Sequence, residues 1–186
     1  MDKRKLVAKN KYESVHEELL EVGTKLLSSE RLTEISLNSI SEYTNISKTT
    51  IYEHFNSSFN KFLSEVILHV WKKIRKIYYD KTNDDPISNI LLIFRTWHEF
   101  NFDNLLLARN IYASYILFVD TEYFPITNVL TDIEDELSKL NFNDEDIKEI
   151  IRIFYISVDE ILGNPDIRNI DNVMKDIELF LNNKKS

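Results

Sequence analysis

Residues 36–55 contain two short helical patterns separated by a polar turn. They read Ser36-Leu37-Asn38-Ser39-Ile40-Ser41-Glu42-Tyr43-Thr44-Asn45-Ile46-Ser47-Lys48-Thr49-Thr50-Ile51-Tyr52-Glu53-His54-Phe55. Serine is a favoured N-cap residue, so Ser36 and Ser47 predict helices over 37–43 and from 48 to about 54. The turn between them includes Asn45, which tolerates a left-handed backbone. Two short helices at this spacing are typical of a helix-turn-helix, whose second helix lies in the DNA major groove.

The composition favours an all-helical globular protein. The chain has 186 residues, of which 43% are hydrophobic and 29% charged, with only 2 glycines and 3 prolines. β-rich folds and glycine-rich phosphate loops need more turn residues than that. No apolar run approaches the roughly 18 residues of a membrane span, and no hydrophobic signal core follows the basic N-terminus. We therefore expect a cytoplasmic protein with no membrane partner.

The charge is unevenly distributed along the chain. The net charge is −8, yet residues 1–80 hold 13 Lys and Arg against 11 Asp and Glu, whereas residues 81–186 hold 10 against 20. A mildly basic N-terminal part joined to an acidic C-terminal part fits a DNA-binding head on a body that does not bind DNA. The alternative is a chance excess of acid on ordinary helix surfaces.

Apolar residues at steps of three and four predict nine helices and no strand. Asp85, Asp103 and Asn143 are expected N-caps, and the acidic run 132–136 is interpreted as a solvent-facing side of a helix. We predict an all-α fold with a helix-turn-helix domain over 1–57 and a helical bundle for ligand binding and dimerisation over 58–186. The expected helices cover about 12–29, 37–43, 48–54, 59–77, 87–100, 104–118, 126–140, 144–162 and 171–181.

The N-terminal part resembles the DNA-binding domain of TetR-family regulators over residues 19–63. The most specific match is Ile51-Tyr52-Glu53-His54-Phe55, which is similar to the family's L/I-Y-x-H-F signature at the end of the recognition helix. The resemblance implies a homodimeric transcriptional regulator, a repressor released by a small molecule, that binds a double-stranded DNA operator. The chain departs from the family at Arg31, at Thr44-Asn45 and at Ser58, where the family has Gly, Ala-Gly and a phosphate-binding Lys.

The residues that would contact DNA lie in and beside the two short helices. Lys48, Thr49 and Thr50 have the side chains to reach base edges and phosphates at the start of the recognition helix. The resemblance implies that Tyr52 and His54 hydrogen-bond phosphates. The alternative is that Tyr52 is a packed aromatic residue and His54 an ordinary surface residue. The full predicted set is Ser36, Leu37, Ser47, Lys48, Thr49, Thr50, Tyr52, Glu53, His54 and Ser58, with Ile40, Ile51 and Phe55 in the core.

The C-terminal helices carry the expected dimer interface and effector pocket. Two recognition helices must lie one DNA turn apart, so a symmetric dimer is implied. The interface candidates are Ile153, Phe154, Ser157, Ile161, Ile177 and Phe180. The pocket candidates are the aromatic and histidine side chains Trp97, His98, Tyr112 and Tyr115. The alternative in both cases is packing within one subunit.

No residue pattern nominates an enzyme, a metal site or a cofactor. The four histidines are scattered, there is no cysteine, and no nucleophile elbow, phosphate loop or dinucleotide fingerprint is present. The alternative function from a different class is a helical protein-interaction module whose DNA-binding-like head no longer binds DNA.

Overall fold

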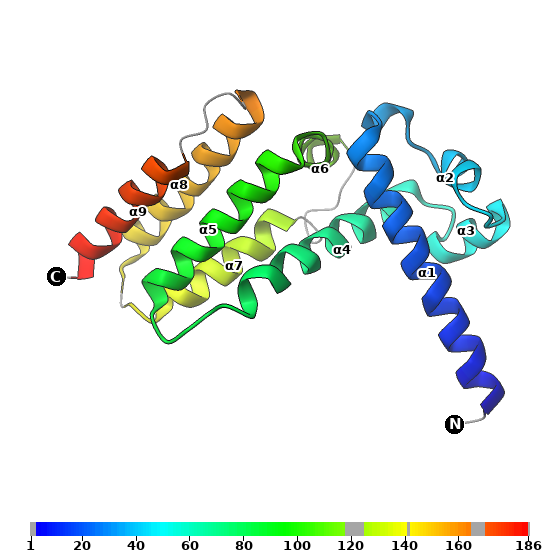
Figure 1. Cartoon of the computed structure of the whole chain (residues 1–186), viewed down its shortest axis with the longest axis horizontal. Coiled ribbons are helices and arrows are strands. Elements are labelled where there is room, and N and C mark those ends of the chain that lie inside the picture. Colours follow the sequence, from blue (N-terminus) through cyan, green and yellow to red (C-terminus); the bar gives the residue numbers. More distant parts are fainter. Residues whose placement is uncertain (1–2, 118–124, 141, 165–169, 186) are drawn as a thin grey trace. The chain divides into compact units, whose positions relative to one another are not determined.

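The computed structural model describes residues 3–117, 125–140, 142–164 and 170–185. Within these ranges every regular element is a helix, so the predicted all-α fold and helix count are confirmed (Figure 1). The α-helices are α1 (Lys3–Ser29), α2 (Leu37–Tyr43), α3 (Lys48–Phe55), α4 (Phe59–Tyr79), α5 (Pro86–Asp103), α6 (Leu105–Leu117), α7 (Pro125–Ser138), α8 (Asp144–Gly163) and α9 (Ile170–Lys185), with a short 3-10 helix η1 (Leu32–Glu34) between α1 and α2.

Three local predictions differ from the structure. The first helix begins at Lys3 rather than residue 12, because residues 3–11 lack the apolar periodicity by which helices were predicted. Asp103 ends α5 and is not a cap; Asn104 precedes α6, and its carbonyl accepts from the Ala108 N–H at 2.9 Å. The left-handed residues are not in the 44–46 turn. Among the described residues they are Asn56 (φ 52°) and Ser57 (φ 57°), directly after α3.

The chain divides into two compact units. Unit 1 comprises residues 1–70 and 109–124, and unit 2 comprises 71–108 and 125–186. The division falls within α4 rather than after residue 57, and α6 also contributes residues to both units.

Unit 1 is built on close packing between α1 and α4. Gly23 of α1 is buried, and a Cβ atom added there would lie 2.5 Å from Val66 Cγ2 and 2.7 Å from the Phe62 ring. Both neighbours are fully buried, so neither has room to move. A side chain at position 23 would therefore overlap the Val66 and Phe62 side chains of α4.

Asn110 of α6 ties that helix to the end of α1. Its Oδ1 accepts from the Leu32 N–H at 3.2 Å, and its Nδ2 donates to the carbonyls of Leu27 and Glu30, each at 2.8 Å. The first two contacts are buried, where an unmatched backbone group is costly. One amide side chain thus satisfies three backbone groups where α1 ends and η1 begins.

Unit 2 is arranged around α5. This helix packs against α7, α8 and α9, as Figure 1 shows. It begins as predicted, with Asp85 accepting from the Ser88 N–H and Pro86 in the first turn. Phe94 meets Phe154 of α8 edge to face, with ring centroids 5.0 Å apart.

The acidic run 132–136 is not simply a solvent-facing surface. Asp132 is buried, accepts a hydrogen bond from the Tyr78 hydroxyl and lies 2.8 Å from Arg75 Nη2. Burial and the Asp132 carboxylate together raise the pKa of Tyr78. Glu136 is half-buried and accepts from Asn89 Nδ2 at 3.1 Å. Two acids of this run therefore join α7 to α4 and α5.

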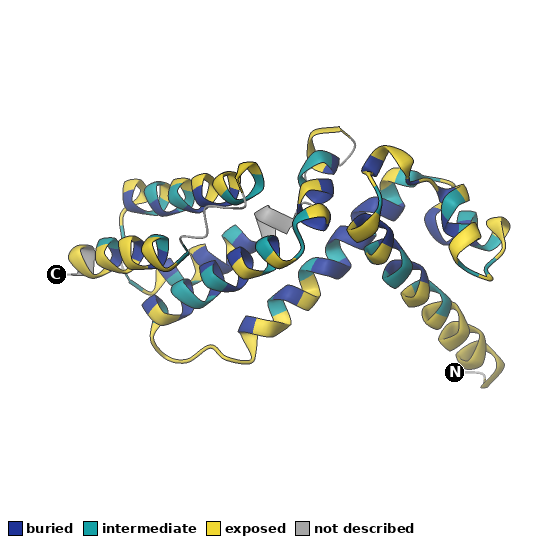
Figure 2. Cartoon of the chain, turned by 45° about the horizontal axis from the view of Figure 1, so that its top comes forward, coloured by how far each residue is buried: buried dark blue, intermediate teal, exposed yellow. Residues whose placement is uncertain are grey.

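The surface pattern agrees with these cores. Figure 2 shows the first turns of α1 exposed on all sides, and residues 3–14 are each exposed. Across the described residues, no helix combines the length and hydrophobicity needed to cross a bilayer.

The Gly23 contact predicts a position-specific effect of adding one methyl group. Gly23→Ala should lower the free energy of unfolding by about 1–2 kcal/mol, because overpacking outweighs the gain of about 1 kcal/mol in helix propensity. Urea titration followed by circular dichroism measures it. Gly163→Ala is the matched control, since a Cβ there meets nothing within 4 Å. Equal effects of the two substitutions would contradict the close packing of α1 on α4.

Candidate nucleic-acid interface

The two short helices are capped by their own sequence. Ser36 and Ser39 form a reciprocal capping box, in which the Ser39 N–H donates to Ser36 Oγ at 3.1 Å and the Ser36 N–H donates to Ser39 Oγ at 2.8 Å. At the start of α3, Ser47 Oγ accepts from the Thr50 N–H at 3.2 Å. Both predicted N-caps are confirmed, and each uses a hydrogen bond within three residues.

Thr44 explains why the turn needs no left-handed residue. Its hydroxyl donates to the Ile40 carbonyl at 3.1 Å and accepts from the Ile46 N–H at 3.2 Å. The side chain thus supplies hydrogen bonds to the backbone on both sides of the turn.

Helix α3 presents a polar face and buries an apolar one. Lys48, Thr49 and Glu53 are exposed, and Thr50 and Tyr52 are half-buried. The opposite face holds the predicted core residues Ile51 and Phe55, which are fully buried together with Ile40 of α2. The arrangement leaves the start of α3 accessible to a ligand.

Tyr52 connects the two helices of the motif. Its hydroxyl donates to Asn38 Oδ1 of α2 at 3.0 Å. The sequence did not nominate Asn38, because a contact between residues 14 positions apart leaves no local signal. The Tyr52 hydroxyl retains a lone pair for one further hydrogen bond.

His54 does not lie where a phosphate contact requires it. Its side chain is buried, with 3% exposure, although it was predicted to face DNA. The ring stacks on Tyr12, with centroids 4.0 Å apart, and its Nδ1 lies 3.1 Å from Nδ1 of His16. His16 Nε2 in turn lies 2.9 Å from Glu65 Oε2. His54 therefore joins α3 to α1.

The histidine pair has one arrangement that satisfies both contacts with neutral rings. His16 Nε2–H donates to Glu65, which leaves His16 Nδ1 to accept from His54 Nδ1–H. Burial lowers the pKa of His54, and the neighbouring His16 lowers it further, while Glu53 opposes these effects. The neutral form of His54 is thus the form that the fold favours.

Two other predicted contacts are modified by the structure. Leu37 is buried, so only its backbone is available at the start of α2. Ser58 Oγ accepts from the Lys61 N–H at 3.2 Å, which makes it a cap of α4 that keeps its hydroxyl proton free to donate. Lys61 Nζ donates to the His54 carbonyl at 3.3 Å and lies 3.7 Å from Glu65, so this lysine is partly engaged within the unit.

Comparison with protein-family models and with curated proteins finds no match for this chain.

The four predicted pocket residues do not gather in one unit. Trp97 and His98 are buried on α5 in unit 2, whereas Tyr112 is half-buried and Tyr115 exposed on the part of α6 in unit 1. His98 Nδ1–H donates to the Phe94 carbonyl at 2.7 Å, and burial lowers its pKa. Trp97 Nε1, His98 Nε2 and Asn101 Nδ2 are buried without a hydrogen-bond partner.

The predicted dimer residues divide by burial. Phe154, Ser157 and Ile177 are buried within the chain, so their side chains serve its own core, as in the alternative of packing within one subunit. Ile153, Ile161 and Phe180 are half-buried. The large apolar side chains that α8 and α9 leave exposed are Tyr155, Ile156 and Leu179.

The lowered pKa of His54 predicts a pH-dependent stability. As pH falls below about 6.5, His54 becomes protonated in the unfolded chain before it does so in the folded protein. The free energy of unfolding therefore decreases as the pH is lowered through this range. Urea midpoints at pH 7.5 and 5.5 should differ less in His54→Gln than in the wild type. His98 acts in the same direction, so part of the dependence should remain in the variant. An undiminished difference would contradict the buried position of His54.

Proposed function

We propose that this protein is a DNA-binding transcriptional regulator of the TetR type, acting as a homodimer that responds to a small molecule. The observation that carries the proposal is the exposed start of α3, with Lys48 and Thr49 presented on a helix whose opposite face is buried. Capping by Ser47 and the Tyr52–Asn38 hydrogen bond hold this helix in a defined orientation to α2. Such pre-organisation is what reading base edges requires.

Each exposed side chain has a distinct part in this proposal. Lys48 supplies a charge for a phosphate or a guanine edge, and Thr49 supplies a hydroxyl and a methyl group that suits thymine. Glu53, one turn after Thr49, accepts from a cytosine amine. Ser36 and Ser47, which cap the two helices, would add phosphate contacts beside them.

Dimerisation is proposed through the outer faces of α8 and α9. Tyr155, Ile156 and Leu179 are exposed there, at 40%, 44% and 52%. Burying such side chains in a symmetric interface would remove them from water and give two recognition helices for successive turns of the major groove.

The effector is proposed to bind in unit 2 beside α5. Trp97 and Asn101 lie one helical turn apart and offer unpartnered N–H donors, while His98 Nε2 offers a lone pair. Buried polar atoms without partners are costly, so a ligand that matches them gains affinity. A flat aromatic molecule that carries acceptors for the two N–H groups and a donor for His98 Nε2 would match this set. Helices α4 and α6, which contribute to both units, would carry the signal.

A second candidate is a head that binds a protein instead of DNA. The observation in its favour is that residues 12–70 hold 4 Lys and Arg against 9 Asp and Glu, an unusual balance for a DNA-binding head. DNA binding therefore requires positive charge from elsewhere in the chain.

Substitution of the exposed start of α3 tests DNA binding. Genomic fragments that the wild-type protein selects should bind the Lys48→Ala/Thr49→Ala variant at least about tenfold more weakly, because both base-edge contacts are lost. Fluorescence anisotropy measures the affinity. Lys25→Ala is the control, since it removes one charge from an exposed position on α1. Unchanged affinity in the α3 variant, or no fragment selected, would contradict the proposal.

The effector site is tested with a fluorescent aromatic probe, anilinonaphthalene sulfonate, whose sulfonate oxygens accept hydrogen bonds. Trp97→Phe and Asn101→Ala should each weaken probe binding by about fivefold or more, because each removes one donor that costs roughly 1 kcal/mol to lose. Asn172→Ala, on an exposed position of α9, is the control and should bind as the wild type does. Equal affinity in all three variants would place the effector elsewhere.

A further inference from the structure

The positive charge of the N-terminal part is concentrated in its first residues. Residues 1–11 hold 5 Lys and Arg and a single acid, whereas residues 12–70 carry a net charge of −5. Without its first eleven residues, the helix-turn-helix would repel a polyanion. These cations lie in the first turns of α1, the helix that precedes the helix-turn-helix.

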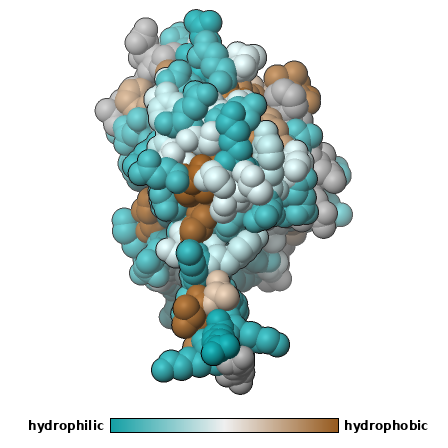
Figure 3. All heavy atoms as spheres, turned by 90° about the vertical axis from the view of Figure 1, so that its right-hand side faces the viewer, coloured by the Kyte–Doolittle hydropathy of each residue, from teal (hydrophilic) through white to brown (hydrophobic). Residues whose placement is uncertain are grey.

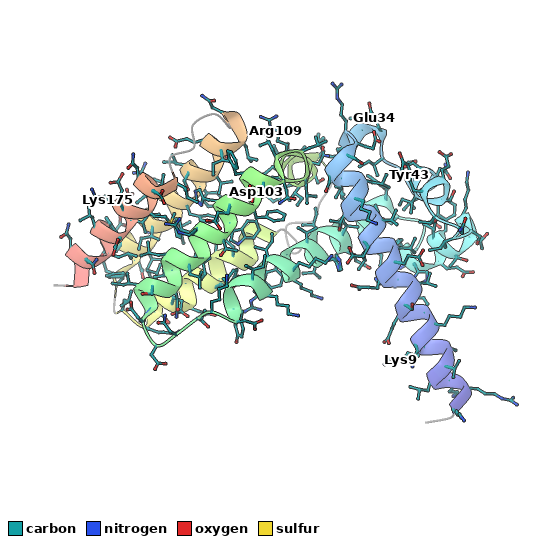
Figure 4. The ribbon with its side chains drawn as sticks, viewed as in Figure 1. Lys9, Glu34, Tyr43, Asp103, Arg109 and Lys175 are labelled. Carbon is teal, nitrogen blue, oxygen red and sulfur yellow. The ribbon has the colours of Figure 1, made fainter. Side chains whose placement is uncertain are left out.

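These cations lie on an exposed extension of α1. Residues 3–11, here called the basic arm, are all exposed, and α1 continues through them without interruption. Figure 3 shows this end of α1 as a narrow, largely hydrophilic projection, and Figure 4 labels Lys9 on it. Because none of residues 3–11 is buried, this part of α1 contributes nothing to the core of unit 1.

The arm is anchored next to the recognition helix. Tyr12 follows it directly and stacks on His54, near the end of α3, with ring centroids 4.0 Å apart. From that contact the nine residues of the arm extend about 13 Å at the usual helical rise of 1.5 Å per residue. The stack with His54 thus determines where the arm leaves the motif.

Three of its five cations share a face, and cations at the start of a helix break a local rule of helix stability. Lys3, Arg4 and Lys11 line one side of the arm together with Val7 and Ala8. The first turn of α1 contains no acidic residue, although the helix dipole disfavours cations there. Local rules tend to be broken where function requires it, and a polyanion placed against this face would offset the unfavourable charge.

We propose that the basic arm binds DNA phosphates flanking the base pairs that α3 contacts, and that it supplies most of the electrostatic affinity of the head. The inference rests on the proposed function, and it names the element that makes an acidic helix-turn-helix able to bind DNA. Lys48 and Thr49 then select sequence, while Lys3, Arg4 and Lys11 hold the duplex through charge.

The salt dependence of binding tests the arm separately from α3. The variant Lys3→Gln/Arg4→Gln/Lys11→Gln removes three charges while keeping good helix formers. The control Lys72→Gln/Lys148→Gln/Lys175→Gln removes the same charge from exposed positions in unit 2. Anisotropy titrations against a selected fragment between 50 and 300 mM KCl give the slope of log affinity against log salt concentration.

The proposed homodimer carries two arms, so the arm variant removes six charges and should lose up to about 5 units of slope, at roughly 0.9 per phosphate. It should bind at least about 10-fold more weakly at the lowest salt. Its preference for the selected fragment over a scrambled one should remain, and the control should keep the wild-type slope. Circular dichroism checks that both variants are folded.

Other outcomes would overturn the inference. If the wild type binds the fragment and the arm variant keeps its slope, the arm does not contact DNA, while the proposed function stands. If the arm variant instead loses binding to phosphatidylserine vesicles, or loses self-association in sedimentation, the arm serves a membrane or a second copy. If the wild type binds no DNA, the arm inference and the proposed function both fail.

Discussion

The close approach of α1 and α4 at Gly23 is the constraint on which unit 1 depends. Because a Cβ at position 23 would overlap the buried side chains of Val66 and Phe62, α1 and α4 pack in this way only around a glycine. The same helix α1 carries Tyr12 and His16, which contact His54 of α3, so its packing against α4 also helps to position these two residues. This packing also sets the end of α1, where Asn110 satisfies three backbone groups.

In the stretch Ile51-Tyr52-Glu53-His54-Phe55 at the end of α3, Tyr52 and His54 make contacts within the protein. Its histidine is a buried link from α3 to Tyr12 and His16, and Tyr52 is held by Asn38 of α2. A motif that looks like a set of phosphate contacts is therefore, in this chain, also a set of packing contacts. Side chains that orient the recognition helix are as necessary to reading DNA as those that touch it.

The charge distribution separates two tasks that a DNA-binding protein must perform. Base reading, which we propose for the start of α3, requires few charges and a rigid helix. Affinity for the phosphate backbone requires several cations, and within residues 1–70 most of these lie in the basic arm. A chain with a net charge of −8 is then compatible with DNA binding, because the field close to a surface depends on local charge rather than on the total.

The all-α fold, the bounds of α2 and the caps at Ser36, Ser47, Asp85 and Asn143 could be predicted from the residues alone. These features depend on hydrogen bonds and apolar spacings within a few residues, which a single sequence displays directly. The burial of His54 and Asp132 could not be predicted in this way, because their partners lie 38 or more positions away in the sequence and meet them only in the folded chain. The arm was missed for a related reason. Its residues are all exposed, so they lack the apolar periodicity that reveals a helix, and their helical form continues from the packed part of α1.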